Sequence, residues 1–290
     1  MDGILILDKE IGVFSRTAGY RVAKMFGEKK FGHIGTLDPM ASGVLPIAIG
    51  NATKMIPFIE EVCENKKEYL FGLKFGIDTD SLDITGNTKE TNDIIPTDTD
   101  IISACKKLQN STEQIPPVFS AIHVNGQRAY ELARKGEDIK MKARPIKIYE
   151  LEYTGKGREK EYNFRVVCSR GTYVRSLVRD IAKLCGAIAT TTYIRRTSTN
   201  GFDIKNAVKL DFLENLVNNG GRIEEYLMQS DCALGDIPVI NLNKEATKFY
   251  KNGGFVETGE SDGLYRVYCD KTFVGIGRVE NKMLKPKRTI

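Results

Sequence analysis

The chain has 290 residues, of which 41% are hydrophobic and 28% are charged, the ordinary composition of a globular protein and not of a disordered one. Its formal net charge of +5 is small and by itself indicates no partner. No apolar run reaches the roughly 18–20 residues that span a bilayer, and the N-terminus lacks the basic region and cleavage site of a signal peptide. We therefore expect no membrane association and a cytoplasmic location.

The cysteine and histidine content excludes the commoner metal sites. The six cysteines, at positions 63, 105, 168, 185, 232 and 269, form no Cys-x-x-Cys pair, and only His33 and His123 are present. This argues against zinc ribbons, redox dithiols and a histidine-based metal centre. Dispersed thiols are typical of a reducing cytosol. We expect no metal site.

The first elements begin with a short apolar run over residues 3–7, which predicts a buried strand. Ser15 is placed to cap a helix that extends to about residue 26. Residues 27–45 contain four glycines and are interpreted as a loop. The pattern predicts a helix over residues 53–61.

A strand is predicted over residues 67–75 (KEYLFGLKF) from their aromatic and apolar content. The acidic segment 77–100 contains turn signals at Gly86-Asn87 and Pro96, and a short helix follows over residues 100–108. Residues 115–148 open with Ile-Pro-Pro-Val, include a polar helix around 129–135 and are too polar to be core. We interpret them as an insertion.

Residues 146–153 and 162–168 alternate apolar and polar side chains and predict paired strands. Residues 172–185 are the clearest helix, with apolar residues at i, i+3, i+4 and i+7 spacing and Gly186 as C-cap. A strand follows over residues 190–196. Two helical segments are then predicted, over residues 208–216 and 222–227.

The predicted secondary structure becomes rich in strands after residue 236, where a helix (244–250) is followed by two strands (264–269 and 273–279). At about 150 residues per domain, a chain of this length is expected to contain two. We predict one domain over residues 1–230 and a small β-rich one over 231–290. Strands come in runs and do not alternate with helices, which favours an α+β fold over a doubly wound α/β fold.

Charge is unevenly distributed along the chain. Seven Lys and Arg stand against one acidic residue in 165–196, seven against three in 121–149, and six against one in the last twenty residues. Residues 77–101 instead hold seven acidic residues against Lys89. Such basic blocks are typical of nucleic-acid-binding surfaces, and solvated helix faces are the alternative that stays open.

The segment 32–43 (GHIGTLDPMASG) is the most distinctive in the chain. Pro39 forces Asp38 out of the helical region, and Gly35 and Gly43 allow another backbone to approach closely. Asp38 is therefore a carboxylate on a shaped, irregular loop and a candidate for chemistry. The plain alternative is a turn aspartate, which is common before proline.

A catalytic carboxylate needs a partner that keeps it ionised, because burial alone favours the neutral form. Arg175, near the start of the 172–185 helix, is the candidate, and a solvent-facing stripe with Arg179 and Lys183 is the alternative. Tyr69 lies in the 67–75 strand. Its ring could stack on a base and its phenol could move a proton, or it could be a core residue.

Five segments occur in the order found in the TruB family: residues 5–9 (LILDK), 32–45 (GHIGTLDPMASGVL), 67–69 (KEY), 168–175 (CSRGTYVR) and 193–196 (YIRR). The chain resembles that family over residues 3–196. Residues 273–277 and 284–286 resemble the family's C-terminal module. Sister families usually have Arg in place of Thr36 and lack the Pro-x-Ala continuation, so the loop around Asp38 is a specific signal.

The resemblance implies a pseudouridine synthase fold, with a mixed, largely antiparallel central sheet flanked by helices. It also implies a thumb-like RNA-binding insertion at about 115–148 and a PUA-like RNA-binding domain over 231–290. The implied activity is the isomerisation of uridine 55 in the T loop of tRNA to pseudouridine after base flipping. The implied partner is the T arm of tRNA, with the acceptor stem as a further contact.

The resemblance implies a role for each matching residue. Asp38 matches the catalytic aspartate, Arg175 the residue that pairs with it, and Tyr69 the residue that stacks on the uracil and takes part in proton transfer. Whether Asp38 attacks the base, attacks C1′ or acts as a base toward the ribose stays open. No cofactor is expected, because an isomerisation needs neither a redox group nor a nucleotide energy source.

The expected substrate-binding residues are His33, Tyr173, Ile194, Lys9 and Thr36. Tyr173 and Ile194 match pocket positions, and His33 matches the residue that fills the gap left by the flipped nucleotide. Lys9 is expected to support Tyr69 or the loop and not to take part in chemistry. Glu10 departs from the family, which usually has Pro there.

Three alternatives compete with this interpretation. The Gly-His-Ile-Gly segment at 32–35 resembles a loop of nucleotidyltransferases and aminoacyl-tRNA synthetases, but Thr36 stands where their second His would be. A non-catalytic RNA-binding protein would be expected to lack Asp38 or Arg175, and both are present. A guide-RNA-dependent relative is disfavoured by the short N-terminus and the thumb-like insertion, so we expect a stand-alone enzyme and, by default, a monomer.

Overall fold

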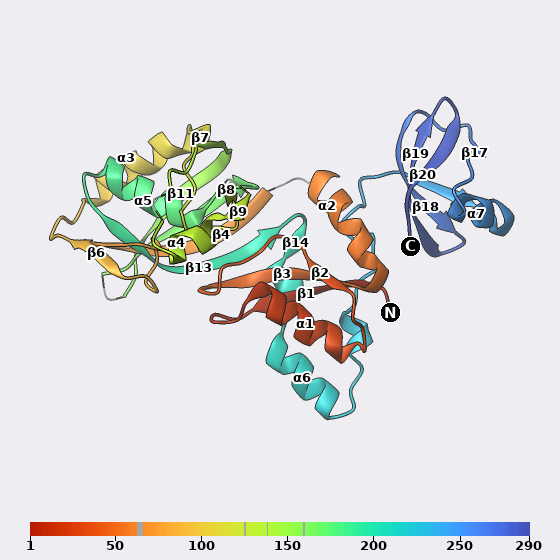
Figure 1. The fold of residues 1–290 in the computed structure, drawn as a ribbon, viewed down its shortest axis with the longest axis horizontal. Coiled ribbons are helices and arrows are strands. Elements are labelled where there is room, and N and C mark those ends of the chain that lie inside the picture. The colour runs from red at the N-terminus through yellow and green to blue at the C-terminus, as the bar shows by residue number, and fades with distance from the viewer. Residues whose placement is uncertain (63–65, 125, 138, 159) are drawn as a thin grey trace. The chain divides into compact units, whose positions relative to one another are not determined.

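The computed structural model describes residues 1–62, 66–124, 126–137, 139–158 and 160–290. The chain divides into two compact units (Figure 1). The first contains Met1–Pro39, Val44–Asn65 and Asn200–Ile290, and the second contains Met40–Gly43 and Lys66–Thr199. Strand β3 (Ala41–Ile49) begins in the second unit and continues in the first.

The centre of the second unit is an antiparallel sheet in the order β11–β12–β4–β13. The first residues of β3 add to it in parallel, with Ile194 opposite Ala41 and Arg196 opposite Gly43. The strands are β4 (Lys66–Phe75), β11 (Ile148–Lys156), β12 (Tyr162–Ser169) and β13 (Ala189–Thr199).

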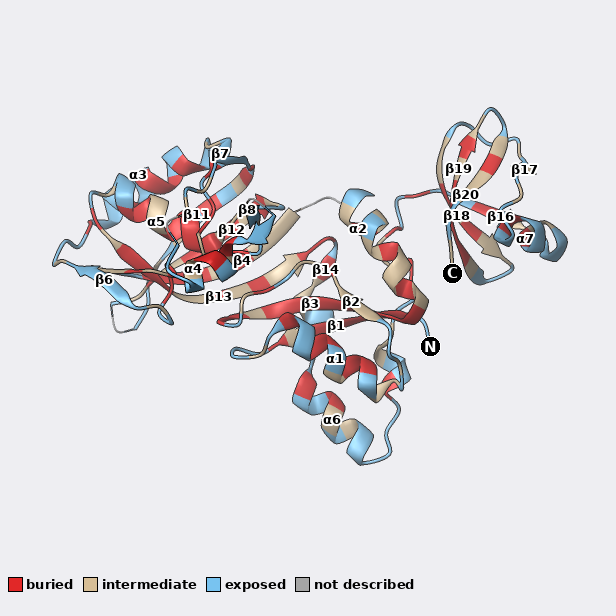
Figure 2. Cartoon of the chain, in the orientation of Figure 1, coloured by how far each residue is buried: buried red, intermediate tan, exposed pale blue. Residues whose placement is uncertain are grey.

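One face of this sheet forms a core under two helices. Side chains alternate strictly between buried and half-buried along β12, and Phe71 stacks on Phe164 with 5.1 Å between ring centroids. Helix α5 (Val174–Leu184) packs on β13 and β4, and α3 (Asp98–Gln109) packs on β11 and α5. Figure 2 shows the buried positions along these strands. Period-2 strands and an amphipathic helix thus share one core.

Two polar segments complete the second unit. The acidic segment forms a short hairpin of β5 (Ile77–Thr79) and β6 (Thr88–Thr91). A two-residue antiparallel pair closes most of the predicted insertion 115–148: β7 (Glu113–Gln114) immediately precedes it, and β10 (Arg144–Pro145) lies just before its predicted end. Between them lie β8 (His123–Val124), β9 (Gln127–Arg128) and α4 (Ala129–Arg134).

In the first unit, β1 (Gly3–Lys9) lies between β3 and β15 (Val208–Lys209), and β2 (Phe31–His33) pairs antiparallel with β3. Helix α1 (Ser15–Met25) packs on β2 and on α6 (Leu210–Asn218). The shorter elements are the 3₁₀ helices η1 (Gly50–Met55), η2 (Ile204–Asn206) and η3 (Ile223–Tyr226), helix α2 (Ile56–Val62) and strand β14 (Phe202–Asp203).

The C-terminal part of the first unit is a five-stranded sheet in the order β16–β18–β19–β20–β17. Its own core includes Tyr250, Val267 and Leu284. Ile276 belongs instead to an apolar cluster with Ile4 of β1. This module and β1 therefore contribute to one buried apolar cluster. Its elements are β16 (Val239–Leu242), α7 (Lys244–Lys251), β17 (Val256–Glu257), β18 (Gly263–Cys269), β19 (Thr272–Glu280) and β20 (Met283–Thr289).

The predicted α+β class is confirmed, with a mixed, largely antiparallel sheet, flanking helices and a β-rich C-terminal part. The predicted domain boundary between residues 230 and 231 stays a prediction. Several elements differ from expectation. The loop predicted over 27–45 contains β2 and the start of β3, because its glycines obscured an otherwise apolar strand.

Three further differences lie in the last third of the chain. Residues 208–209 form strand β15 and the helix starts at Leu210. The helix predicted over 222–227 is a short 3₁₀ turn, and the basic tail forms a third strand, β20. Within β20 Leu284 is the single buried residue, and Lys285, Lys287 and Arg288 leave too few apolar side chains for a strand to be recognised from the sequence.

Other expectations concern membranes, metals and thiols. Among the described residues, no helix is both long and apolar enough to cross a membrane. Within the same part of the chain, no group of three or more His, Cys, Asp or Glu is placed to hold a metal ion. Cysteines 105, 168, 185, 232 and 269 carry free thiols, and Cys63 lies outside the described residues.

Candidate functional site

The backbone on both sides of Asp38 is fixed by hydrogen bonds. The Ser15 hydroxyl donates to the Leu37 carbonyl (2.8 Å) and accepts from the Leu37 N–H (3.0 Å). On the other side, the Gly12 N–H donates to the Pro39 carbonyl at 2.8 Å. Leu37 is buried and Asp38 is half-buried. The loop therefore holds the half-buried carboxylate on a backbone that is anchored before and after it.

Ser15 does not cap helix α1, contrary to the sequence-based expectation. The residue that precedes the helix is Phe14, which has no capping side chain. The Ser15 hydroxyl is turned instead toward Leu37, where it satisfies two backbone groups of the loop. A buried N–H and C=O need such partners, so the Ser15 hydroxyl bonds to the loop and not to the N-terminal end of helix α1.

Lys9 is buried, with 1% of its surface exposed. Its ammonium donates to the carbonyls of Glu10 (2.7 Å) and Val13 (2.8 Å), and more distantly to that of Pro39 (3.5 Å). A buried cation is tolerated only with such acceptors. Lys9 thus ties the turn after β1 to the residue that follows Asp38.

His33 and Thr36 flank the same loop. His33 is the last residue of β2, lies opposite Ile47 of β3 and is half-buried. Ile34 follows as a fully buried residue, and Gly35 has φ +72°, a conformation that favours glycine. Thr36 is exposed. The chain therefore turns sharply between the histidine and the aspartate.

In the second unit, Tyr69, Ile194 and Arg196 share one face of the sheet. Tyr69 lies directly opposite Arg196 in the β4–β13 pair, and Ile194 is two residues before Arg196. Because strand side chains alternate with a period of two, these three project to the same side. All three are buried, with 7%, 5% and 0% of their surfaces exposed.

The Arg196 guanidinium hydrogen-bonds the Tyr69 side chain. Burial lowers the pKa of Arg196, and the hydrogen bond and charge of Tyr69 act in the opposite direction. Gly43 makes the approach of β3 to Arg196 possible. An added Cβ there would lie 2.1 Å from the Arg196 carbonyl oxygen, and φ at Gly43 is +104°.

Arg175 is buried at the N-terminal end of α5 and makes three described contacts. Its guanidinium donates to the carbonyls of Ser81 and Phe119, both at 2.9 Å. Its Nη1 also lies 3.6 Å from Oδ2 of Asp83, and both side chains are 5% exposed. The solvent-facing stripe considered for Arg175 is thereby ruled out at this residue. Its interaction with Asp38 stays a prediction.

Asp83 is itself held in place. Its Oδ1 accepts hydrogen bonds from the hydroxyls of Ser81 (3.0 Å) and Thr85 (2.5 Å) and from the Thr85 N–H (3.0 Å). This leaves Oδ2 facing Arg175. The acidic segment thus supplies an ordered carboxylate next to the arginine that the sequence singled out.

Tyr173 precedes α5 as its N-cap residue, and its backbone N–H and C=O both bond to the Gln114 side chain. The second unit therefore brings Tyr173 and Arg175 together at one helix end, and Tyr69 with Ile194 on one sheet face. The first unit gathers Lys9, His33, Thr36 and Asp38 around one loop.

Sequence reasoning missed Ser15 as a loop anchor, and it missed Asp83, Gln114 and Arg196. A signal existed for Arg196, since it occupies the inward phase of an alternating strand two residues after Ile194. Asp83 stands between Ser81 and Thr85, a spacing that favours local hydroxyl–carboxylate bonding. Gln114 carries no local signal, because its partners lie 59 residues away.

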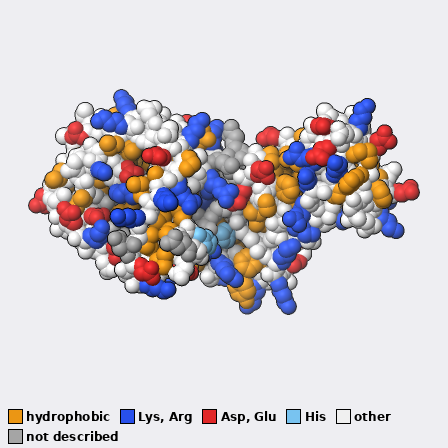
Figure 3. Space-filling view, turned by 45° about the horizontal axis from the view of Figure 1, so that its top comes forward, with side chains coloured by type: hydrophobic (Ala, Val, Ile, Leu, Met, Phe, Trp, Pro, Cys, Tyr) orange, Lys and Arg blue, Asp and Glu red, His pale blue; other side chains and the backbone are white. Residues whose placement is uncertain are grey.

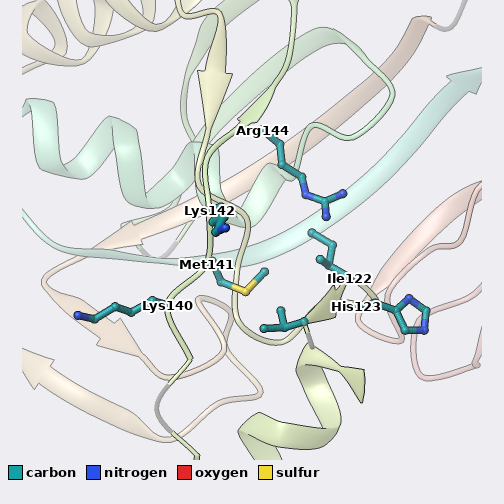
Figure 4. Close-up of a pocket in the computed structure, with 7 residues that line it drawn as sticks. Ile122, His123, Lys140, Met141, Lys142 and Arg144 are labelled. Carbon is teal, nitrogen blue, oxygen red and sulfur yellow. The ribbon is translucent and has the colours of Figure 1, made fainter. Parts of the chain in front are cut away.

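The insertion contains a basic cavity of about 190 Å³. Its lining includes Lys140, Lys142 and Arg144, all exposed, together with His123 and Ile122. In Figure 4 the Lys140 and Arg144 side chains extend in different directions from the segment that carries them. Figure 3 shows Lys and Arg side chains interspersed with Asp and Glu on the face it presents.

Comparison with known proteins places this geometry in context. The model of the TruB family pseudouridylate synthase N-terminal domain matches residues 23–174, and that of the pseudouridine synthase II TruB C-terminal domain matches residues 238–290. The chain is 40% identical to tRNA pseudouridine synthase B of Clostridium kluyveri, over 96% of this chain and 95% of that protein. Identity to the protein of the same name from Lactobacillus johnsonii is 35%, over 99% and 97%.

Among solved structures, a chain in a Cbf5–Nop10–Gar1 complex matches with a TM-score of 0.69 and 22% identity, covering 99% of this chain and 84% of that one. A chain in an H/ACA RNP bound to a substrate RNA containing 2′-deoxyuridine matches with the same score at 21% identity, with coverage of 99% and 84%. These likenesses show a shared fold.

Proposed function

The chain belongs to the TruB family of pseudouridylate synthases, which are isomerases, and we propose that it converts uridine 55 in the T loop of tRNA to pseudouridine. The observation that carries this proposal is the Asp38 loop, with a half-buried carboxylate between two anchored backbone positions. Such anchoring suits a residue that must be held in place while a substrate reacts.

The proposed reaction detaches uracil from C1′, rotates it and reattaches it through C5. Substrate and product have the same atoms, so the conversion needs no oxidant, reductant or energy source. Asp38 is the essential group, and attack on the base, attack on C1′ and deprotonation of the ribose are its three candidate roles. In each of them Asp38 must be ionised before the step begins.

Arg175 is proposed to keep Asp38 ionised, because a nearby guanidinium favours the charged form of a carboxylate. Its contacts with Ser81, Phe119 and Asp83 fix the orientation of the guanidinium. Tyr69 is proposed to stack on the uracil and to take part in proton transfer. Ile194, on the same sheet face, and Tyr173 would complete the pocket.

A uridine inside a folded loop must be extruded before it can react, at a cost of a few kcal/mol. We assign to His33 the filling of the gap that the flipped nucleotide leaves. Its half-buried position at the end of β2, before the buried Ile34, supports a firmly seated ring. Thr36 is exposed and is proposed to contact the RNA, with Lys9 supporting the loop from inside.

RNA contact is proposed for two basic surfaces. One is the thumb-like insertion at about 115–148, where Lys140, Lys142 and Arg144 are exposed. The other is the PUA-like C-terminal module over 231–290, where Lys287 and Arg288 are exposed on β20 and would reach the acceptor stem. Exposed cations of this kind position an RNA through its phosphates.

We propose that the enzyme acts alone, as a monomer and without a guide RNA. Identity of 32–40% to proteins named tRNA pseudouridine synthase B over most of the chain supports this, against 21–22% to the Cbf5 and H/ACA chains. Free thiols on the five described cysteines support the cytoplasm as its location.

The test uses the purified protein, a minimal T-arm stem-loop and no added cofactor. Asp38→Asn keeps the size of the side chain and should abolish pseudouridine formation in a primer-extension assay while RNA affinity stays within about twofold, because only the ionisable group is lost. Glu224→Gln, the same change from carboxylate to amide at an exposed position of the same unit outside the 231–290 module, is the matched control and should retain full activity. Product formation by Asp38→Asn would refute the assignment.

A further inference from the structure

The insertion is joined to the rest of the second unit at a short base. Gln114 and Arg144 lie opposite each other in the two-residue β7–β10 pair, where the inserted chain leaves and returns. Arg144 also lines the basic cavity of the insertion. Gln114 therefore lies at the base of the insertion, opposite a residue that lines its cavity.

Gln114 is almost fully buried, with 4% of its surface exposed. Its Oε1 accepts the Tyr173 N–H at 2.9 Å, and its Nε2 donates to the Tyr173 carbonyl at 3.3 Å. One amide thus satisfies both backbone groups of a single residue. That residue is the N-cap of helix α5, and its own side chain makes no capping hydrogen bond.

The first turns of α5 bond to the start of the insertion at three more points. The Arg175 Nη2 donates to the Phe119 carbonyl, and the Ser176 hydroxyl and Arg179 Nη2 both donate to the Ile115 carbonyl, each at 2.9 Å. The carbonyls belong to the insertion, and the donors belong to the helix that carries the proposed partner of Asp38.

We propose that Gln114 is a positioning residue that couples the base of the insertion to Tyr173 and Arg175, so that seating the insertion on an RNA aligns both. This inference rests on the proposed function. Gln114 does not touch the substrate in this scheme. It acts by fixing the entry of α5, and reactions are sensitive to such alignment, since an error of about 1 Å can cost a factor of about 10² in rate.

The experiment compares Gln114→Met with the wild-type full chain. Methionine has a similar length but cannot form either hydrogen bond to Tyr173. Gln109→Met is the matched control, because Gln109 lies in the same unit, is exposed and donates a single bond to the Tyr149 carbonyl (3.2 Å). Single-turnover rate on T-arm RNA, RNA affinity and thermal unfolding are measured for each protein.

We expect the single-turnover rate of Gln114→Met to fall by tenfold or more while RNA affinity stays within about twofold, and Gln109→Met to match the wild type. In an Arg175→Lys background the same change should have a smaller effect, because both substitutions disturb the same groups. Loss of both bonds to Tyr173 should lower the unfolding temperature in either case, so a purely structural role is recognised by additive rate effects.

Three results would overturn the proposal: an unchanged rate, a loss confined to RNA affinity, or full additivity with Arg175→Lys. Should Gln114→Met not fold, Gln114→Asn decides in its place, because it keeps the uncharged amide but is one methylene shorter, which draws both amide atoms away from Tyr173. Its rate should lie between those of wild type and a full loss, and a wild-type rate would overturn the coupling. If the wild type itself makes no pseudouridine, the proposed function fails, which is a distinct outcome.

Discussion

At the scale of single residues, the second unit is organised around two buried arginines. Arg196 is fully buried against Tyr69, and Arg175 is 4% exposed between two carbonyls and Asp83. A guanidinium loses its hydration on burial, and only good acceptors offset that loss. The surroundings of both arginines therefore fix the direction in which each can donate, which a solvated arginine would not show.

Tyr69→Phe tests the buried pair directly. It keeps the ring and removes the hydroxyl that Arg196 hydrogen-bonds, so we expect the free energy of unfolding to fall by about 1–3 kcal/mol, measured by urea denaturation. Tyr130→Phe is the control: among the described residues the Tyr130 hydroxyl bonds to exposed Glu131, so its loss should change stability by less than about 0.5 kcal/mol. Equal effects of the two substitutions would contradict a special role of the buried contact.

At the scale of elements, helix α1 and the Asp38 loop form one structure. The hydroxyl of Ser15, in the first turn of the helix, bonds both backbone groups of Leu37. Lys9 and Gly12, from the end of β1 and the turn after it, hold the Pro39 carbonyl. Two separate elements thus fix the loop on either side of Asp38. A change in either element should alter the position of the Asp38 carboxylate.

Ser15→Ala should uncouple helix and loop. Removing the hydroxyl leaves a buried N–H and C=O of Leu37 without this partner, so we expect a loss of about 1–3 kcal/mol in stability. The rate should fall about tenfold, since the carboxylate is less well held. Thr53→Ala, which removes a half-buried hydroxyl bonded to the Gly50 carbonyl in η1, is the control and should leave the rate intact. An unchanged rate in Ser15→Ala would show that the loop holds itself.

At the scale of the whole molecule, the basic blocks of the sequence differ in how much charge they expose. In the 165–196 block, Arg175 and Arg196 are buried and Arg165 forms ion pairs with Glu68 and Glu150. The insertion and strand β20 instead present exposed cations. Arg170 and Lys183 of the 165–196 block are exposed as well, so burial removes only part of its charge, and the proposed phosphate contacts are strongest for the insertion and β20.

The salt dependence of RNA affinity should show which Lys and Arg side chains contact RNA phosphates. The logarithm of affinity should fall linearly with the logarithm of salt concentration, by about 0.7–0.9 per neutralised phosphate. Replacing Lys140 and Lys142 together by Ala should reduce that slope by about 1.4–1.8 in a filter-binding titration. Lys106→Ala, an exposed residue of α3 in the same unit, should leave it unchanged. A slope that the double substitution does not alter would remove the insertion from the RNA interface.

Much of the architecture could be predicted from the sequence because it depends on local periodicity. The alternation in 162–168 and the apolar spacing in 172–185 gave strand β12 and helix α5 within a few residues. Strand β3 could not be recognised, since Gly43 is required there by the backbone of Arg196, a contact between residues 153 positions apart. Judged from its neighbours in the sequence alone, Gly43 indicated a loop.

The sequence by itself determined the candidate residues Asp38, Tyr69 and Arg175 and the irregular backbone at Asp38. Proline and glycine constrain that backbone locally, whatever the rest of the fold. What only the tertiary structure decided is which groups hold them: Ser15 and Lys9 for the loop, Arg196 for Tyr69, and Asp83 and Gln114 for the α5 helix end. The physical reason is that a buried polar group takes whichever partner the fold brings within hydrogen-bond distance. That partner is set by packing between distant segments and leaves no trace in local spacing.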